Sequence, residues 1–298
     1  MPQYQFKRLR DVWLSDKQFM KVSTGIETLD SITNGGLLTQ NLYVFQAPTG
    51  VGKTTFLMDM CLKCLKSLQK VMYITAGEQD IDEIASRLAC MHCHVSYKDY
   101  MNMGVDDKTN KIIYKLQKDY GTKLYIFYTD DPMTFYRTEG EKESLTDLQR
   151  ALKICQEEKI QYIFYDYLGS TPCEDDKEFK FLTNLAGELK NLATANNLCI
   201  CTCMQTNRMI WGEIRKIKNK DDVATDYKGV MIPLFNEDFS AKSVGVATKA
   251  TVFATIWKLA DRYYMDVFKN RITGEVCRIP LEIKWDDFSY TFSELTPF

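Results

Sequence analysis

The stretch Ala47-Pro48-Thr49-Gly50-Val51-Gly52-Lys53-Thr54-Thr55 lies between two apolar runs, residues 42–45 and 56–58. This order is typical of a strand, a glycine loop and a helix. Glycines at 50 and 52 let the loop fold its backbone N–H groups around an anion, and the helix that follows adds the positive end of its dipole. We expect the whole stretch to bind ATP, with Lys53 at the β- and γ-phosphates and the Thr54 hydroxyl on Mg²⁺. Ala47 replaces the usual first glycine, and its small side chain still permits the tight turn.

The composition suits one large α/β domain with a short extension, because the chain has 298 residues and 45% of them are apolar. The formal net charge of −2 excludes a polycation that coats nucleic acid by bulk charge, so any DNA contact has to come from local basic loops. The sequence contains no 18-residue apolar run and does not open with a signal peptide. We therefore expect a cytoplasmic protein, in the host cytoplasm if a phage encodes it.

Apolar, β-branched and aromatic runs alternate with helical patterns as far as residue 203. This alternation predicts an α/β fold with a mainly parallel central sheet and helices on both faces, as in P-loop NTPases. Four closing runs predict antiparallel hairpins at 251–258, 262–268, 276–284 and 289–293. We expect one motor domain over residues 22–298. Residues 1–21 mix aromatic and charged side chains and form an expected N-terminal arm or linker, which either docks on a neighbouring subunit or packs as a helix on its own domain.

The cysteines raise the question of a metal site. Cys199, Cys201 and Cys203 alternate along one apolar run, so we expect them on one buried face of a strand, where free cysteine behaves as a small hydrophobic residue. Residues 90–94 hold two cysteines and both histidines of the chain. A zinc site needs ligands on converging segments, and four candidates within five residues do not easily surround one ion. We expect a helix end with packed cysteine and histidine there, and a metal site is the alternative.

Three polar residues follow apolar strands, at the sheet edge where open α/β sheets bind ligands. Asp166 follows the run 162–165 and is a candidate Mg²⁺ ligand, directly or through water; the alternative is a turn-forming aspartate. Glu78 follows the run 71–75 and is a candidate general base for the attacking water; the alternative is an acid that interacts with a helix dipole. Gln205 follows a further strand and is a candidate sensor of the γ-phosphate, although the residues alone give only a weak signal.

The ordered set of motifs resembles the RecA-fold motor domain of hexameric replicative helicases, the DnaB type and the related phage primase–helicase and mitochondrial Twinkle type. The motifs are Ser23-Thr-Gly-Ile-Glu-Thr-Leu-Asp30, the phosphate loop, Glu78, Asp166-Tyr-Leu168, Gln205-Thr-Asn-Arg208 and Lys269-Asn-Arg271-Ile-Thr-Gly274. The resemblance implies an ATP hydrolase of the superfamily 4 helicase type that forms a ring, usually a hexamer, and moves 5′→3′ on single-stranded DNA. It implies Glu78 as catalytic base, Gln205 as sensor, and Arg271 as an arginine finger in the neighbouring subunit's site with Lys269 beside it.

The same resemblance places DNA contacts on two loops, at about 168–178 and 208–248. The second loop is long and basic, which suits tracking of phosphates without reading of sequence, and a solvated surface loop is the alternative. Its candidate DNA-binding residues are Arg208, Arg215, Lys216, Lys218 and Lys220. The sequence departs from the family at 245–252, where DnaB-type proteins carry acids and a glutamine. Family members usually also carry an N-terminal primase or helix-bundle domain. Three alternatives follow for this chain: a stripped-down phage-type helicase, a fragment, or a protein whose partner domain is separate, in which case primase, polymerase or loader proteins are the expected partners.

Two other functions share these ATP-binding motifs. A RecA-type recombinase exchanges strands in open filaments rather than closed rings. Recombinases of this type tend to place lysines where this chain has Lys269-x-Arg271, which favours the helicase. A regulatory RecA-fold ATPase that assembles with protein partners and ignores DNA is the second alternative. The altered segment 245–252 and the mild net charge are compatible with it.

Overall fold

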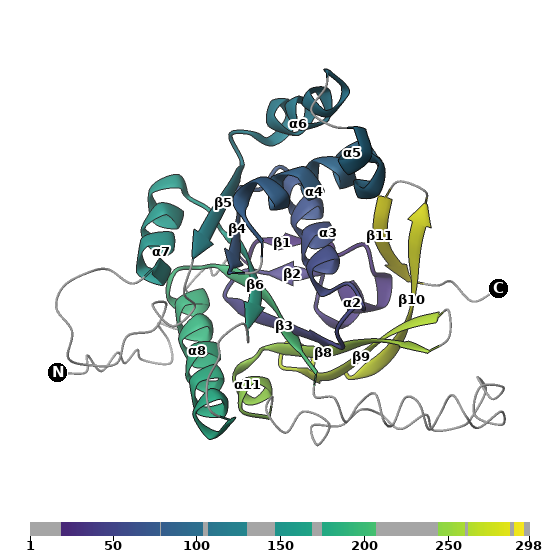
Figure 1. Cartoon of the computed structure of the whole chain (residues 1–298). Helices are drawn as coiled ribbons and strands as arrows, with labels where there is room; N and C mark the ends of the chain where they lie inside the picture. Colours follow the sequence, from purple (N-terminus) through teal and green to yellow (C-terminus); the bar gives the residue numbers. More distant parts are fainter. Residues whose placement is uncertain are drawn as a thin grey trace.

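The computed structural model describes residues 19–77, 79–103, 107–129, 147–168, 175–206, 244–259, 262–286 and 289–294. Within these ranges the backbone forms one large mixed sheet flanked by helices on both faces (Figure 1). No helix in this part of the chain has the length and apolar character needed to cross a bilayer. Residues 1–18 lie outside the described ranges, so the expected N-terminal arm stays a prediction.

The large sheet has the strand order β11-β10-β9-β8-β3-β7-β6-β4-β5. The strands are β3 (Asn41–Ala47), β4 (Val71–Ala76), β5 (Leu124–Thr129), β6 (Tyr162–Leu168), β7 (Cys199–Gln205), β8 (Val252–Leu259), β9 (Arg262–Asn270), β10 (Cys277–Asp286) and β11 (Ser289–Glu294). All neighbours from β8 to β5 are parallel, and β8, β9, β10 and β11 pair antiparallel in succession. The predicted parallel sheet with closing antiparallel hairpins is therefore confirmed. A small antiparallel pair, β1 (Lys21–Val22) and β2 (Leu37–Leu38), lies beside it.

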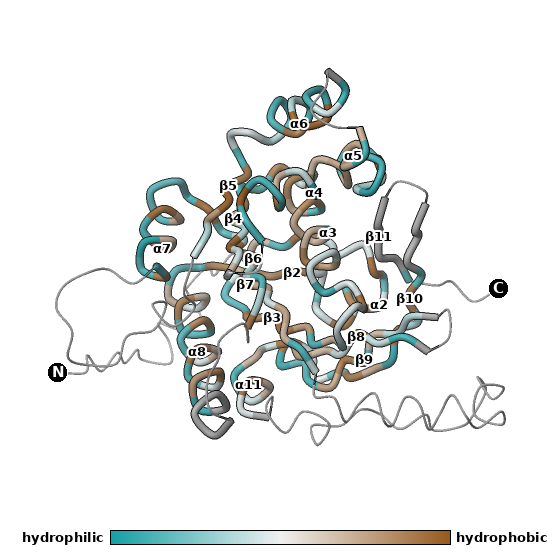
Figure 2. The backbone as a smooth tube through the Cα atoms, viewed as in Figure 1, coloured by the Kyte–Doolittle hydropathy of each residue, from teal (hydrophilic) through white to brown (hydrophobic). Residues whose placement is uncertain are grey.

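The helices in the described part of the chain flank the sheet, and all of them except α5 carry buried apolar residues. They are α2 (Glu27–Ile32), α3 (Lys53–Lys66), α4 (Ile81–Cys93), α5 (Tyr97–Met103), α6 (Asp107–Tyr120), α7 (Asp147–Glu158), α8 (Asp175–Ala195) and α11 (Val244–Lys249). The central strands contribute apolar residues to a core on each face of the sheet, as parallel strands covered on both faces must. Figure 2 shows how far apolar residues run along these strands. In β3, Tyr43 and Phe45 face the core shared with α2, α3 and α4, whereas Leu42 and Val44 face the core shared with α7, α8 and α11.

The three alternating cysteines of β7 lie on one buried face, as the sequence predicts. Cys199, Cys201 and Cys203 are fully buried in the core under α3. The cluster at 90–94 is the end of α4, which the sequence also predicts. His92 contacts Asp119 of α6, with its Nε2 atom 2.7 Å from the carboxylate, and the Cys93 thiol donates to the Ile112 carbonyl at 3.7 Å.

In the motif before the phosphate loop, residues 23–30, the first residues donate hydrogen bonds to the last, Asp30. The Asp30 carboxylate accepts hydrogen bonds from the Ser23 hydroxyl at 2.5 Å, the Thr24 hydroxyl at 2.6 Å and the Thr24 backbone N–H at 2.8 Å. A carboxylate that accepts several short hydrogen bonds fixes the chain around it. Residues 23 and 24 are therefore tied to α2, which precedes β2 and β3 in the chain.

Candidate nucleotide site

The candidate site lies at the edge of the sheet where the parallel strands end. The strands β3, β7, β6 and β4 are consecutive neighbours, so their carboxyl ends share this edge. Ala47 pairs with Gln205, and Thr75 pairs with Asp166. The strand register therefore brings the phosphate loop, the sensor candidate and the metal-ligand candidate together from distant parts of the chain. Glu78 follows β4 at the same edge in sequence but lies outside the described residues.

The phosphate loop has the backbone that an anion cradle requires. Gly50 and Gly52 have φ angles of +80° and +94°, a left-handed conformation that favours glycine. Gly52 is the N-cap of α3, so the first helical N–H groups of Lys53, Thr54 and Thr55 lie directly after the loop. A Cβ atom built on Gly50 meets no atom within 4 Å, so the loop borders open space. This arrangement fits a bound phosphate.

Asp166 is held in place by a buried tyrosine from the next strand. The Tyr73 hydroxyl donates to Asp166 Oδ2 at 2.8 Å, and Asp166 itself is only 7% exposed. Burial and the neighbouring Asp166 charge raise the pKa of Tyr73 well above its usual value, so the hydroxyl keeps its proton and remains a donor. Lys53 lies over the Tyr167 ring, with its Nζ atom 5.9 Å from the ring centre. An oriented carboxylate beside the loop fits a Mg²⁺ ligand.

Gln205 contacts the phosphate loop directly. Its Nε2 atom donates to the Thr49 hydroxyl at 2.6 Å, and the Thr206 N–H donates to the Ala47 carbonyl at 3.1 Å. The structure thus joins the end of β7 to both the first and third residues of the loop. A movement of the Thr49 hydroxyl on phosphate binding would act on Gln205 through this hydrogen bond.

Lys269 and Arg271 lie at the other end of the parallel strands, beside the start of β3 rather than its carboxyl end. The Arg271 N–H donates to the Thr251 carbonyl, and the Thr251 N–H donates to the Leu42 carbonyl. Leu42 is near the start of β3, five residues before Ala47, which corresponds to about 17 Å along the strand. An arginine side chain does not span that distance. Arg271 therefore cannot reach the phosphate loop of its own chain, and the Lys269 ammonium donates to the Ala247 carbonyl instead.

The candidate DNA-binding residues Arg208, Arg215, Lys216, Lys218 and Lys220 all lie outside the described residues, so their role stays a prediction. The segment 245–252 is described: it forms α11 and the start of β8. The sequence pattern did not predict this short helix.

Two cavities within the described ranges lie at different places on the fold. One, of about 330 Å³, begins at the first turns of α3 and is lined by Thr55, Met58, Arg87, Cys90, Met91, Val95, Tyr97 and Lys98. The Arg87 guanidinium stacks over the Tyr97 ring at 4.9 Å. Sequence reasoning missed this cavity and also missed Tyr73. A tyrosine hydroxyl in an otherwise apolar strand beside Asp166 was the available signal.

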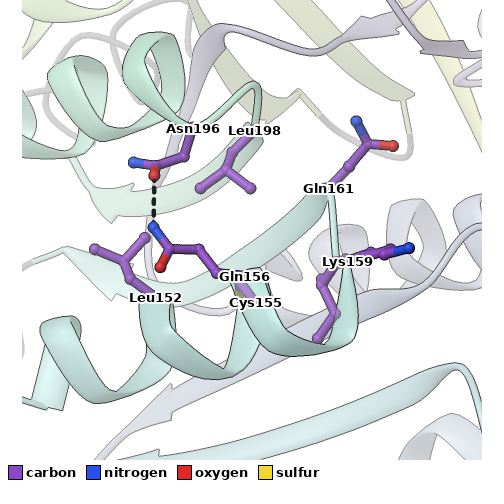
Figure 3. Close-up of a pocket in the computed structure, with 8 residues that line it drawn as sticks. Leu152, Cys155, Gln156, Lys159, Gln161, Asn196 and Leu198 are labelled. Atoms are coloured by element: carbon purple, nitrogen blue, oxygen red, sulfur yellow. Dashed lines mark hydrogen bonds between the residues drawn. The ribbon is translucent and has the colours of Figure 1, made fainter.

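The other cavity, of about 340 Å³, lies where β6 and β7 begin, on the far edge from the phosphate loop (Figure 3). The ends of α7 and α8 border it, and the Gln156 amide donates to the Asn196 side-chain carbonyl at 3.0 Å across it. Because nucleotides bind at strand ends rather than strand starts, we assign no nucleotide contact to this cavity.

Comparisons with known proteins agree with this fold. A family profile for the DnaB-like helicase C terminal domain matches residues 21–225. The present chain superposes on a DnaB-like replicative helicase whose structure was reported together with its interactions with primase. The TM-score is 0.66 at 13% identity, over 97% of the present chain and 66% of the helicase chain. A solved ATPase domain superposes with a TM-score of 0.65 at 13% identity, over 96% of this chain and 95% of that domain.

A more local similarity links the chain to a DNA repair protein, RadA of Helicobacter pylori. The two are 30% identical over 93 residues, which is 31% of this chain and 20% of RadA. The family profile covers more than two thirds of the present chain and includes the phosphate loop, β4, β6 and β7. The chain therefore belongs to the DnaB-like helicase C-terminal domain family, and its sheet and phosphate loop form a RecA-fold, replicative-helicase-type ATPase core.

Proposed function

We propose that this protein is an ATP-dependent replicative DNA helicase that assembles into a hexameric ring and moves 5′→3′ on single-stranded DNA. One observation carries the proposal: the phosphate loop lies at the carboxyl end of β3, whereas the Lys269–Arg271 pair lies beside the start of that strand. A complete site then needs the loop of one subunit and the cations of the next. Hydrolysis depends on assembly, and an arginine finger supplied in this way is worth ~10³–10⁵ in rate.

Within this proposal each residue has one role. Lys53 and the loop N–H groups bind the phosphates of ATP, and Thr54 with Asp166 holds Mg²⁺. The ion, when bound, neutralises charge on the phosphate oxygens. Glu78 takes a proton from the attacking water, and Gln205 responds to the γ-phosphate through Thr49. Lys269 and Arg271 stabilise the charge that develops in the neighbouring subunit's site.

The cavity beside α3 supports a place for the nucleotide base. It begins at Thr55, one residue after the proposed Mg²⁺ ligand, and offers an apolar wall with the stacked Arg87–Tyr97 pair. A flat aromatic base suits a cavity that is largely apolar with a few polar groups. We assign the base of ATP to this cavity.

DNA binding is assigned to basic residues in the segment of sequence that follows Gln205, namely Arg208, Arg215, Lys216, Lys218 and Lys220. Such residues follow the DNA backbone without reading sequence. Residues 1–21 are assigned as an arm that docks on the neighbouring subunit. A separate primase, polymerase or loader is a proposed partner, since the DnaB-like helicase that this chain resembles in fold was solved with regard to its interactions with primase.

One set of measurements tests the proposal. ATPase rates are compared with and without single-stranded DNA, and the same samples are tested on a forked duplex. The proposal expects DNA-stimulated hydrolysis and unwinding, and hydrolysis indifferent to DNA contradicts it. Next, Lys53→Ala and Arg271→Ala proteins are mixed. Each supplies the half-site that the other lacks, so rings shown to be mixed should recover activity. No recovery in such rings contradicts the shared site.

A RecA-type recombinase is the second candidate, and the local similarity to the RadA repair protein favours it. Both functions predict DNA-stimulated hydrolysis. They differ in product, because a recombinase pairs strands and does not unwind a fork. Strand pairing without unwinding in the same samples would transfer the assignment to the recombinase.

A further inference from the structure

The short helix α11 holds both candidate finger cations with its backbone. The Lys269 ammonium donates to the Ala247 carbonyl, and the Arg271 guanidinium donates to the Thr248 carbonyl at 2.9 Å. The two cations are thus fixed on one short element rather than projecting independently from β9. Arg271 is exposed beyond this contact, so its guanidinium faces solvent where a second subunit can approach.

The end of α11 suits cations. The last carbonyls of a helix have no partner inside it and carry the negative end of the helix dipole. Ala247 and Thr248 lie in this last turn, immediately before Lys249. The helix therefore offers its free acceptors to the two side chains that need them.

The position of α11 is set by close contact with α8. Val246, Ala247 and Ala250 are buried in the core shared with α8. A Cβ atom built on Gly245 lies 1.9 Å from the Thr183 hydroxyl oxygen and 2.9 Å from Thr183 Cβ. The two helices therefore meet at a point where no side chain larger than that of glycine fits.

A third cation, Lys190 of α8, lies within electrostatic range of Arg271. Lys190 is half-buried and donates to the Gln40 carbonyl at 2.8 Å. Burial, and to a lesser extent the charge of Arg271, lowers the pKa of Lys190 below its usual value. Two positive groups within electrostatic range cost free energy, and an anion placed between subunits relieves that cost.

We propose that α11 and its contact with α8 position Lys269 and Arg271 for the neighbouring subunit's phosphate. In the isolated chain the carbonyls of Ala247 and Thr248 hold the cations. In an assembled ring the phosphate replaces a carbonyl partner, since hydrogen bonds between charged groups are roughly twice as strong as neutral ones. Gly245 and Thr183 are positioning residues, because they act through α11. This inference rests on the proposed function, in which Arg271 works on the neighbouring subunit.

The test uses two glycine substitutions on the same helix contact. Gly245→Ala forces α11 away from Thr183, so we expect kcat to fall by about 10²-fold, the loss that a misplacement near 1 Å produces, with KM for ATP unchanged. Gly187→Ala is the matched control on α8. A Cβ atom there lies 3.8 Å from the nearest Lys249 carbons, an ordinary contact. It should keep the wild-type kcat, and a Gly245→Ala protein that also does so overturns the inference.

Mixing separates positioning from general damage. A Gly245→Ala subunit keeps its phosphate loop, and a Lys53→Ala subunit keeps its cations, so mixed rings should regain activity. If they do not, while Arg271→Ala and Lys53→Ala rings do, the inference is wrong and the proposed function stands. If neither pair recovers in rings shown to be mixed, both fail. If the Gly245→Ala protein does not fold, Thr183→Met replaces it in each of these experiments. Thr183 is half-buried on α8, and the larger methionine side chain pushes α11 away from the other side of the same contact. Thr183→Val, which keeps the size of the side chain, is its control.

Discussion

The Tyr73 hydroxyl is one atom that connects the core to the candidate metal site. It donates to Asp166 Oδ2 at 2.8 Å from a fully buried position. We expect Tyr73→Phe to reduce the apparent affinity for Mg²⁺ by about 10–100-fold, the usual cost of losing a group that orients a metal ligand. Because a buried carboxylate loses a hydrogen bond, unfolding should also become easier by about 1.5–3 kcal/mol. Mg²⁺ titration of the ATPase and urea denaturation measure the two effects.

Tyr162→Phe provides the same chemical change without the same contact. Tyr162 is fully buried on the same face of the sheet, and its hydroxyl makes no hydrogen bond within the described part of the chain. Its variant should keep both Mg²⁺ affinity and stability. Equal Mg²⁺ responses in the two variants would show that Tyr73 does not orient the metal ligand.

The contact between Gln205 and Thr49 makes a second prediction at this scale. The amide donates to the Thr49 hydroxyl at 2.6 Å. We expect Gln205→Ala to lower kcat by about 10²-fold with nucleotide binding retained, as for removal of one preorganised polar group. Thr49→Ala and the double variant complete a thermodynamic cycle. If the two losses add without a coupling energy, no signal passes through this hydrogen bond.

Sequence alone predicted Lys53, Asp166 and Gln205 at one edge, because each follows an apolar run and strand ends of a parallel sheet coincide. It did not predict Tyr73. A tyrosine in a strand is typical of any buried sheet, and only the pairing of β4 with β6 shows that this one meets Asp166.

At the scale of elements, α3, α4 and α5 enclose the cavity assigned to the base. We expect Arg87→Met to raise KM for ATP about tenfold, equivalent to ~1.4 kcal/mol, while kcat stays the same at saturation. The reason is loss of the guanidinium stacked over Tyr97 at 4.9 Å, which forms one side of the cavity. Arg150→Met on α7 is the control, since that arginine is exposed and pairs with Asp147 away from the cavity. An unchanged KM for Arg87→Met would remove the base from this cavity.

The helix α11 shows what periodicity cannot predict. Its six residues, Val-Gly-Val-Ala-Thr-Lys, include one glycine and three β-branched side chains, all of lower helix propensity than alanine. So short a helix is not stable by itself and forms through tertiary packing. Its contact with α8 depends on Thr183, which lies more than sixty residues earlier in the chain. No local pattern carries that information.

At the scale of the whole molecule, the closing hairpin decides how the site is divided. β8 runs parallel to β3, and β9 returns antiparallel, so Asn270 pairs with Val252 near the start of β3. Sequence predicted both the parallel sheet and the hairpins, and the resemblance supplied Arg271 as a candidate finger. The distance between the two half-sites follows only from strand register, which the sequence pattern does not specify.

This division makes ATPase activity depend on protein concentration. Dilution separates subunits, so the rate per subunit should rise with concentration and level off once assembly, followed by light scattering, is complete. The rise is bounded by the ~10³–10⁵ that a finger supplied in trans contributes. Arg271→Ala should assemble along the same curve but stay at the low rate throughout, because its exposed guanidinium is absent while the buried contacts of β9 remain. A rate per subunit that stays constant, while scattering reports the change from monomer to assembly, would contradict the shared site. Each chain would then complete its own site, against the separation of Arg271 from Ala47 along β3.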